Sequence, residues 1–274
     1  MQLAKPVSGV VLYWLGQAGF ALRAGDRTLL IDPYLSDNLE RKYRGSATPH
    51  ERMMPAPIAV DDLPPIDLVL VTHPHTDHMD PETLAPLAAS QPRVHFVVPA
   101  AALEEPRRRI GVDDRRLLPA SPGVALSPLP GLDIMPIRAA HEGLDPRFLG
   151  HGLALDGLRI VHSGDTIPFA GQIAELKALG ADLALFTVNG RSAELGAKGI
   201  AGNLTAAEAV ATAEAAGIPD LVAHRYGMFA FNTAAPEAID ALCASEKKVH
   251  MIRARTRMAM GLRSRAEDGS EVTN

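Results

Sequence analysis

Along this chain, short hydrophobic segments are separated by short polar ones, and this pattern predicts a mixed α/β fold. Near the N-terminus three apolar segments, 10–15, 20–24 and 27–31, are separated by glycine-containing turns. Short apolar runs between such turns are typical of strands, so they predict an antiparallel meander. From 36 to 65 the sequence is polar and rich in proline, which predicts a long excursion from the sheet.

Beyond this excursion the pattern alternates between strands and helices. Strands are predicted over 66–71, 93–98, 133–137, 182–188 and 221–223, around 124–126, and in a hairpin of 150–155 with 158–161. Helices are predicted over 100–110, 173–179 and 236–244. A further helix is predicted to begin after the cap Asp80, with a kink or an early end at Pro86. Another is predicted from the capping box of Thr205 and Glu208 to Gly217. This alternation favours one α/β domain over 1–265, followed by a polar tail over 266–274 that we expect to be disordered.

One loop carries most of the candidate chemistry. Directly after the predicted strand 66–71 the chain has the pattern His-x-His-x-Asp-His, formed by His73, His75, Asp77 and His78. Imidazoles and carboxylates are good ligands for a borderline divalent metal ion. Open α/β sheets usually place their sites at the carboxyl ends of strands. The pattern therefore predicts a metal-binding loop rather than a histidine-rich surface loop.

Further polar side chains follow other predicted strands; they are Asp32, His141, Asp165 and His224. Taken alone, His141 is more often a structural or surface histidine and Asp165 more often a turn residue that caps its own loop, so the prediction depends on whether these side chains converge. Asp32 in particular is either a turn-forming residue before proline or a residue that orients a metal ligand.

The composition narrows the class of protein. A net charge of −5 argues against a polyanion such as nucleic acid as a partner. The sequence contains no apolar run near the length of a membrane span and no basic-then-apolar leader, so we expect neither a membrane partner nor secretion, and a cytoplasmic location. The single cysteine, Cys243, lies in a helical pattern and is expected to pack in the core.

The order of the candidate ligands along the chain resembles the metallo-β-lactamase superfamily. Several segments are also similar to the branch that contains the L-ascorbate-6-phosphate lactonases; they lie at 14–20, 32–37, 163–166, 189–191, 202–203 and 227–229. The resemblance extends from residue 10 to residue 233. It implies a four-layer αββα sandwich, in which two facing sheets are covered outside by helices and the site lies at one end of the sheets.

The resemblance also implies the ligands of two divalent ions. His73, His75 and His141 would hold one ion, Asp77, His78 and His224 the other, and Asp165 would bridge them. Relatives tend to have His-x-Asp-Met-Phe near the end, whereas this chain reads His-Arg-Tyr-Gly-Met-Phe from His224, so that a glycine replaces the acid. The ligand set admits zinc, manganese or iron; the lactonase branch implies manganese and the wider superfamily implies zinc.

Two ions held close together would lower the pKa of a bridging water from about 15.7 to about 7 and supply hydroxide at neutral pH. Asp77 is expected to orient this hydroxide and accept its proton, and Glu142 is a candidate for carrying a proton to the leaving group. Asn189, Arg191 and Asn203 are candidates for binding a phosphate or sugar hydroxyls.

The sequence leaves the reaction open between three hypotheses. The first is hydrolysis of a lactone or ester of a sugar acid or its phosphate. The second is hydrolysis of a phospholipid-like or nucleotide-like diester, and the third is a metal-stabilised binding protein without turnover. The flavin-linked di-iron oxidases of the same fold typically need a glutamate at the position of His75 and a flavodoxin domain, and this sequence has neither. The expected partner is a small molecule, with an anionic one as an option, and a homo-oligomer is also compatible with the sequence.

Overall fold

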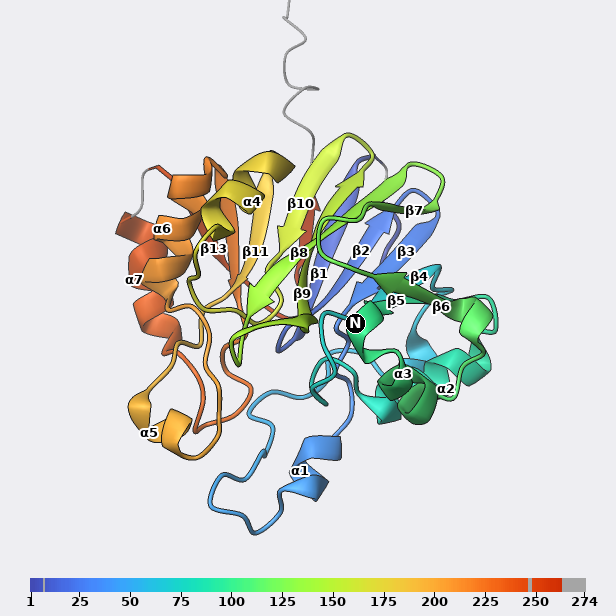
Figure 1. Cartoon of the computed structure of the whole chain (residues 1–274), viewed down its shortest axis with the longest axis horizontal. Coiled ribbons are helices and arrows are strands. Elements are labelled where there is room, and N and C mark those ends of the chain that lie inside the picture. Colours follow the sequence, from blue (N-terminus) through green and yellow to red (C-terminus); the bar gives the residue numbers. More distant parts are fainter. Residues whose placement is uncertain (7, 246–247, 263–274) are drawn as a thin grey trace, which may run out of the picture.

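The computed structural model describes residues 1–6, 8–245 and 248–262, and its centre consists of two mixed sheets (Figure 1). The first has the strand order β14-β1-β2-β3-β4-β5-β6 and the second β13-β12-β11-β10-β9-β8-β7. The strands of the first sheet are β1 (Val10–Gly16), β2 (Gly19–Ala24), β3 (Arg27–Ile31), β4 (Leu68–Leu70), β5 (His95–Pro99), β6 (Leu117–Ala120) and β14 (Ala259–Leu262). Those of the second are β7 (Leu126–Leu129), β8 (Leu132–Ala140), β9 (Leu144–Leu155), β10 (Leu158–His162), β11 (Leu183–Thr187), β12 (Asp220–His224) and β13 (His250–Arg253).

The helices cover the outer faces of the sheets, with α2 and α3 on the side of the first sheet and α4, α6 and α7 on that of the second (Figure 1). Their bounds are α1 (Asn38–Lys42), α2 (Pro81–Ser90), α3 (Glu104–Ile110), α4 (Gln172–Leu179), α5 (Ala193–Ala197), α6 (Ala206–Ala216) and α7 (Pro236–Ser245). Short 3₁₀ turns lie at Val60–Asp62, Ala100–Ala102 and Asp114–Arg116. The predicted four-layer αββα sandwich is confirmed.

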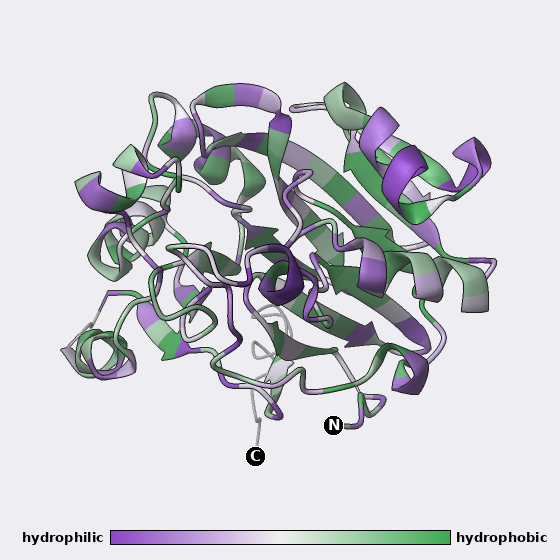
Figure 2. Cartoon of the chain, turned by 90° about the horizontal axis from the view of Figure 1, so that it is seen from below, coloured by the Kyte–Doolittle hydropathy of each residue, from purple (hydrophilic) through white to green (hydrophobic). Residues whose placement is uncertain are grey.

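The period-two alternation of the strands explains why the layers stack. In β4, Leu68 and Leu70 belong to the hydrophobic core shared by the two sheets. Val69 of β4 and Val71, which directly follows the strand, point to the opposite face of the sheet and pack with Leu84 of α2. Successive strand residues point to opposite faces, so a continuous apolar run fits a strand that is covered on both sides. Figure 2 shows the same distribution, with hydrophobic residues concentrated along the strands and more hydrophilic ones on the outer helices.

Several local predictions are confirmed. β1, β2 and β3 form the antiparallel meander. Asp80 caps α2, and Thr205 with Glu208 forms the capping box of α6, which ends at Gly217 in the left-handed conformation. The 36–65 excursion contains only α1 and one 3₁₀ turn.

Other local predictions differ from the structure. Pro86 does not end α2, which continues to Ser90 because proline removes only one helical hydrogen bond, while Leu84 and Leu87 on either side remain buried. The predicted 100–110 helix is a 3₁₀ turn followed by α3. Strands β6, β13 and β14 were not predicted, and β9 begins six residues before the predicted residue 150, at Leu144.

The topology brings the candidate residues to one end of the sandwich. β3 and β4 are parallel in one sheet, and β10, β11 and β12 are parallel in the other. The ends of these strands and the loops that follow them carry most of the predicted site residues, and His141 and Glu142 follow β8. The predicted 266–274 tail lies outside the described residues, and the single-domain assignment stays a prediction. Among the helices described, none is long and apolar enough to cross a membrane.

Candidate metal centre

The loop after β4 is fixed at both ends. At its start, the backbone N–H of Val71 still donates to the carbonyl of Val97 at 2.9 Å. Inside it, the carbonyl of His75 accepts from the backbone N–H groups of His78 and Met79, at 3.0 and 2.7 Å. At its end, Asp80 caps the first turn of α2. A loop that is held in this way presents its side chains in a defined geometry, as metal binding requires.

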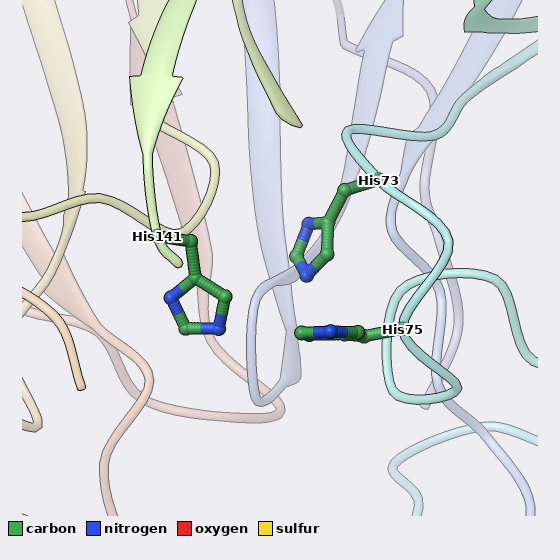
Figure 3. Close-up of side chains that lie close together, drawn as sticks. All are labelled: His73, His75 and His141. Carbon is green, nitrogen blue, oxygen red and sulfur yellow. The ribbon is translucent and has the colours of Figure 1, made fainter. Parts of the chain in front are cut away.

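Three imidazoles converge at this end of the sandwich: His73 and His75 from the loop, and His141 directly after β8 (Figure 3). Each offers a nitrogen, and the three nitrogens lie within 4.8 Å of one another. The ring centroids are 4.7 to 5.5 Å apart. Nitrogens at this spacing can share one divalent cation at the usual bond length of about 2.0–2.1 Å after small side-chain adjustments.

The protonation of the three rings suits a metal ion. Burial lowers the pKa of His73, His75 and His141, which keeps them in the neutral form that binds metals. Nδ1 of His73 lies 3.0 Å from Oγ1 of Thr72, which donates its own proton to Asp32. Nε2 of His73 is buried and has no hydrogen-bond partner among the described residues. Since buried polar atoms are nearly always paired, this free nitrogen fits a metal ligand.

Phe148 of β9 completes the surroundings of the three imidazoles. Its ring centroid lies 5.1 Å from that of His73, 5.5 Å from His75 and 5.6 Å from His141. An apolar ring at this place limits the rotation of all three imidazoles and keeps water from their inner side. Nothing in the sequence indicated this role, because the contact depends on the long β8–β9 hairpin.

A second group of ligand atoms, within 4.8 Å of one another, comprises His73, His78 and Asp165. Oδ2 of Asp165 lies 3.4 Å from Nε2 of His78 and 3.6 Å from Nε2 of His141. Asp165 therefore lies between the two histidines that the resemblance assigns to different ions. Asp32, expected as a ligand-orienting residue, is fully buried with Oδ2 at 2.6 Å from Nδ1 of His78.

Arg225, which the sequence analysis did not assign to the site, lies in the middle of this second group. Its Nη1 is 2.9 Å from Oδ2 of Asp77 and 2.8 Å from Nε2 of His78, and its Nη2 is 2.8 Å from Oδ2 of Asp165. Burial by itself would raise the pKa of both carboxyl groups, but the charge of Arg225 acts against it, and both values are lowered. Both carboxylates are thus ionised at neutral pH.

The protonation state of His78 follows from these contacts. Burial would lower its pKa, whereas the carboxylates of Asp165, Asp32 and Asp77 raise it to about 10. A guanidinium can only donate, however, so the 2.8 Å contact with Arg225 requires an unprotonated Nε2. We therefore describe His78 as neutral, with its proton on Nδ1 and directed at Asp32.

Two expected ligands have other contacts. Oδ2 of Asp77 accepts a hydrogen bond from Nε2 of Gln17 at 2.8 Å, in addition to its ion pair with Arg225. Nδ1 of His224 lies 3.4 Å from the carbonyl of Gln17, and its ring stacks on that of His162 at 5.0 Å. In the described part of the chain, neither Asp77 nor His224 belongs to either group of converging ligand atoms. Gln17 is a further residue that the sequence reasoning missed.

A cavity of about 350 Å³ is lined by His75 and His141 of this group, whereas His73 is buried behind them. One wall is aromatic, since Tyr43 stacks on His50 at 4.2 Å, and Phe229 and Phe231 lie 4.9 and 4.7 Å from His50. The cavity lining also includes cationic Lys42 and Lys198, together with Arg225 and Asn232. Glu142 borders it, with Oε1 at 3.5 Å from Nε2 of His75 and a half-exposed side chain.

The three predicted substrate-binding residues contact one another rather than the cavity. Asn203 donates to Oδ1 of Asn189 at 3.0 Å, and Asn189 donates to Oδ1 of Asn232 at 2.9 Å. The guanidinium of Arg191 forms two 2.6 Å bonds with Glu208 and one of 3.1 Å with the carbonyl of Asn203. Only Asn232 of this network lines the cavity.

The family of the chain follows from comparison with known proteins. The family model of the beta-lactamase superfamily domain matches residues 27–224, from β3 to the end of β12. The chain therefore belongs to the beta-lactamase superfamily. Its fold has the two mixed sheets and covering helices of the metallo-β-lactamase fold.

Individual proteins agree with this assignment. A UPF0173 metal-dependent hydrolase from Polynucleobacter asymbioticus is 30% identical over 205 residues, which cover 65% of this chain and 64% of that protein. The N-acyl-phosphatidylethanolamine-hydrolyzing phospholipase D 1 of Caenorhabditis elegans is 29% identical over 92 residues, or 34% of this chain and 25% of that protein. The structure of a possible metal-dependent hydrolase from Veillonella parvula aligns with a TM-score of 0.73 and 16% identity, over 93% of this chain and all of that one (100%).

Proposed function

We propose that this protein is a metal-dependent hydrolase whose metal ion is held by His73, His75 and His141. The observation that carries the proposal is the convergence of three neutral imidazoles on one point at the edge of a cavity. A divalent ion bound there would lower the pKa of a water ligand and polarise a carbonyl or phosphoryl oxygen of the substrate. The nitrogen ligands suit zinc, and manganese and iron are compatible with them.

The chain supplies groups that would handle the protons. Glu142 is the candidate for carrying a proton to the leaving group, because its Oε1 lies on the cavity side of His75 at 3.5 Å. Asp77, predicted to act on the attacking water, is ionised and held by Gln17 and Arg225. Its remaining oxygen can orient a water through an accepted hydrogen bond. Asp165, whose Oδ2 lies beside Nε2 of both His78 and His141, would be available as a further ligand on the side of the site that faces His78.

We propose a small lactone or ester of a sugar acid, or of its phosphate, as the substrate class. The small cavity volume limits the size of the substrate. Lys42 and Lys198 would attract an anionic group, and the aromatic wall offers a flat surface for a sugar or lactone ring. The three predicted substrate-binding residues would not contact the substrate directly. Their hydrogen-bond network would hold Asn232 at the cavity; they are Asn189, Arg191 and Asn203.

A phosphodiester is the second candidate substrate. It is favoured by the similarity of part of the chain to the phospholipase D of Caenorhabditis elegans. The same ligand set would serve both reactions, because an ionised water can attack either a carbonyl carbon or phosphorus.

A parallel assay separates the candidates. The protein is stripped with a chelator, reloaded with zinc or manganese, and tested against a lactone panel and bis-p-nitrophenyl phosphate. Metal-dependent turnover of lactones supports the first proposal, and preference for the diester supports the second. Turnover that survives complete metal removal overturns both. A protein that loses thermal stability on chelation but hydrolyses nothing is a metal-stabilised binding protein instead.

A further inference from the structure

We propose that the guanidinium of Arg225 occupies the position that the family resemblance gives to a second metal ion, so that the protein binds one ion per chain. This inference rests on the proposed metal site at His73, His75 and His141. It differs from the two-ion expectation drawn from the sequence.

The contacts of Arg225 are the first argument. Its two terminal nitrogens lie 2.8–2.9 Å from atoms of Asp77, His78 and Asp165. These three side chains are the ones assigned to the second ion or to the bridge between the ions. The guanidinium thus occupies Nε2 of His78 with a hydrogen bond and supplies a positive charge to the same two carboxylates, although both oxygens of Asp165 lack a hydrogen-bond partner among the described residues.

The electrostatics of this place disfavour a metal ion beside the arginine. Arg225 is 7% exposed, and arginine remains protonated in proteins. A dication bound to Asp77, His78 and Asp165 would lie in contact with the guanidinium, and like charges repel strongly in buried surroundings. The ion could enter only if Arg225 gave up two buried ion pairs.

The backbone fixes Arg225 at this place. The residue directly follows the last residue of β12 and has a φ of 61°, in the left-handed region that residues other than glycine rarely adopt. Its N–H donates to the carbonyl of Gln17 at 3.0 Å. The strand end and this hydrogen bond fix the backbone of Arg225 and thereby direct its side chain into the site. These surroundings also maintain a backbone conformation that is unfavourable by itself.

His224, the remaining ligand expected for a second ion, has a buried Nε2 without a hydrogen-bond partner among the described residues, but this atom does not converge with the other ligand atoms. The ring of His224 stacks on His162 and lies outside both groups of ligand atoms found in the described residues. Its sequence context departs from the family pattern at the same point, since Gly227 stands where an acid is usual. By contrast, the described hydrogen bonds and ion pairs include none between Arg225 and the three-histidine site; its charge acts on His141 but leaves that ring neutral, in the form that binds a metal.

Metal counting by native mass spectrometry in excess zinc tests the inference. The wild type should bind one ion per chain, His75→Ala should lose it, and Asp77→Ala should keep it. Arg225→Ala should bind two ions, because Asp77, His78 and Asp165 become free to act as ligands. Arg253→Ala is the matched control: this arginine is also paired with a carboxylate, Asp240, at 2.6 and 2.7 Å, but lies outside the site. It should keep one ion.

Two ions in the wild type would overturn the assignment of Arg225 and leave the proposed hydrolase intact. The absence of any bound ion would overturn the proposed function and this inference together. A single ion that is lost in Asp77→Ala but kept in His75→Ala would also overturn the assignment of Arg225, because the ion would then be bound at the position expected for the second metal ion. If Arg225→Ala does not fold, the wild-type, His75→Ala and Asp77→Ala counts still decide the matter.

Discussion

Nδ1 of His78 lies 2.6 Å from Oδ2 of Asp32, although the two residues are 46 positions apart in the chain. Asp32 also accepts hydrogen bonds from the backbone N–H and the hydroxyl of Thr72, at 2.8 and 2.6 Å. One fully buried carboxylate therefore ties the end of β3 to the start of the histidine loop. It also fixes the ring of His78 with Nε2 directed into the site.

We expect Asp32→Ala to destabilise the protein by about 1–3 kcal/mol for a buried donor that is left without its acceptor, with the donors of Thr72 and His78 affected together. Urea denaturation of the metal-free protein measures this change. Asp26→Ala is the control, since Asp26 is exposed and pairs with Lys5 at the surface. A loss of stability no larger than that of the control would show that Asp32 does not hold the loop.

His75→Ala should abolish hydrolysis while the protein stays folded. The His75 side chain is 37% exposed, so its removal leaves no large cavity in the core, but it takes away one of the three converging nitrogens. Turnover, metal content and circular dichroism of the same sample test this prediction. His95→Ala, at the start of β5 and outside the site, should retain both metal and activity. Unchanged turnover in His75→Ala would contradict the proposed site.

Glu142→Gln should lower kcat by a factor of about 10²–10⁴, which is the usual contribution of a general acid or base. The metal content should not change, because Glu142 lies beside His75 without belonging to either ligand group in the described chain. The kcat–pH profile should lose one limb in the variant. Asp145→Asn, an acid nearby on β9 that pairs with Arg147, is the matched control. An unaltered pH profile in Glu142→Gln would assign the proton transfer to another group.

The metal-free protein should become less stable as the pH falls below 6.5. Burial lowers the pKa of His162 from 6.5 to about 3. Its Nδ1 accepts from the N–H of Gly164 at 3.0 Å, and protonation would remove this bond. Between the two pKa values the unfolded chain binds the proton and the folded chain does not, so stability rises with pH and is lost on acidification.

Urea denaturation in chelator at several pH values between 7 and about 4.5 measures this dependence. His162 contributes a slope of about 1.4 kcal/mol per pH unit. His162→Gln removes the titrating group, and we expect the slope to decrease by about that amount. An equal slope in the variant and the wild type would mean that His162 is protonated in the folded state.

By itself, the sequence determined the parts of this protein that depend on neighbouring residues. The His73–His78 loop between a buried strand and the cap Asp80, the meander of β1 to β3, and the Thr205 capping box are local patterns, and the structure contains all three. Such features follow from the spacing of side chains along a single segment, which the sequence displays directly.

Only the tertiary structure decided which side chains complete the site. Arg225 looks like any arginine after a strand, Gln17 like a turn residue and Phe148 like a strand residue. They enter the site because β1 and β12 end, and β9 begins, beside the histidine loop, although these strands are distant in the chain. A burial of this kind leaves no local signal. In the proposed one-ion arrangement, the number of bound cations depends on the position of Arg225 relative to two carboxylates, and the packing of the two sheets fixes that position.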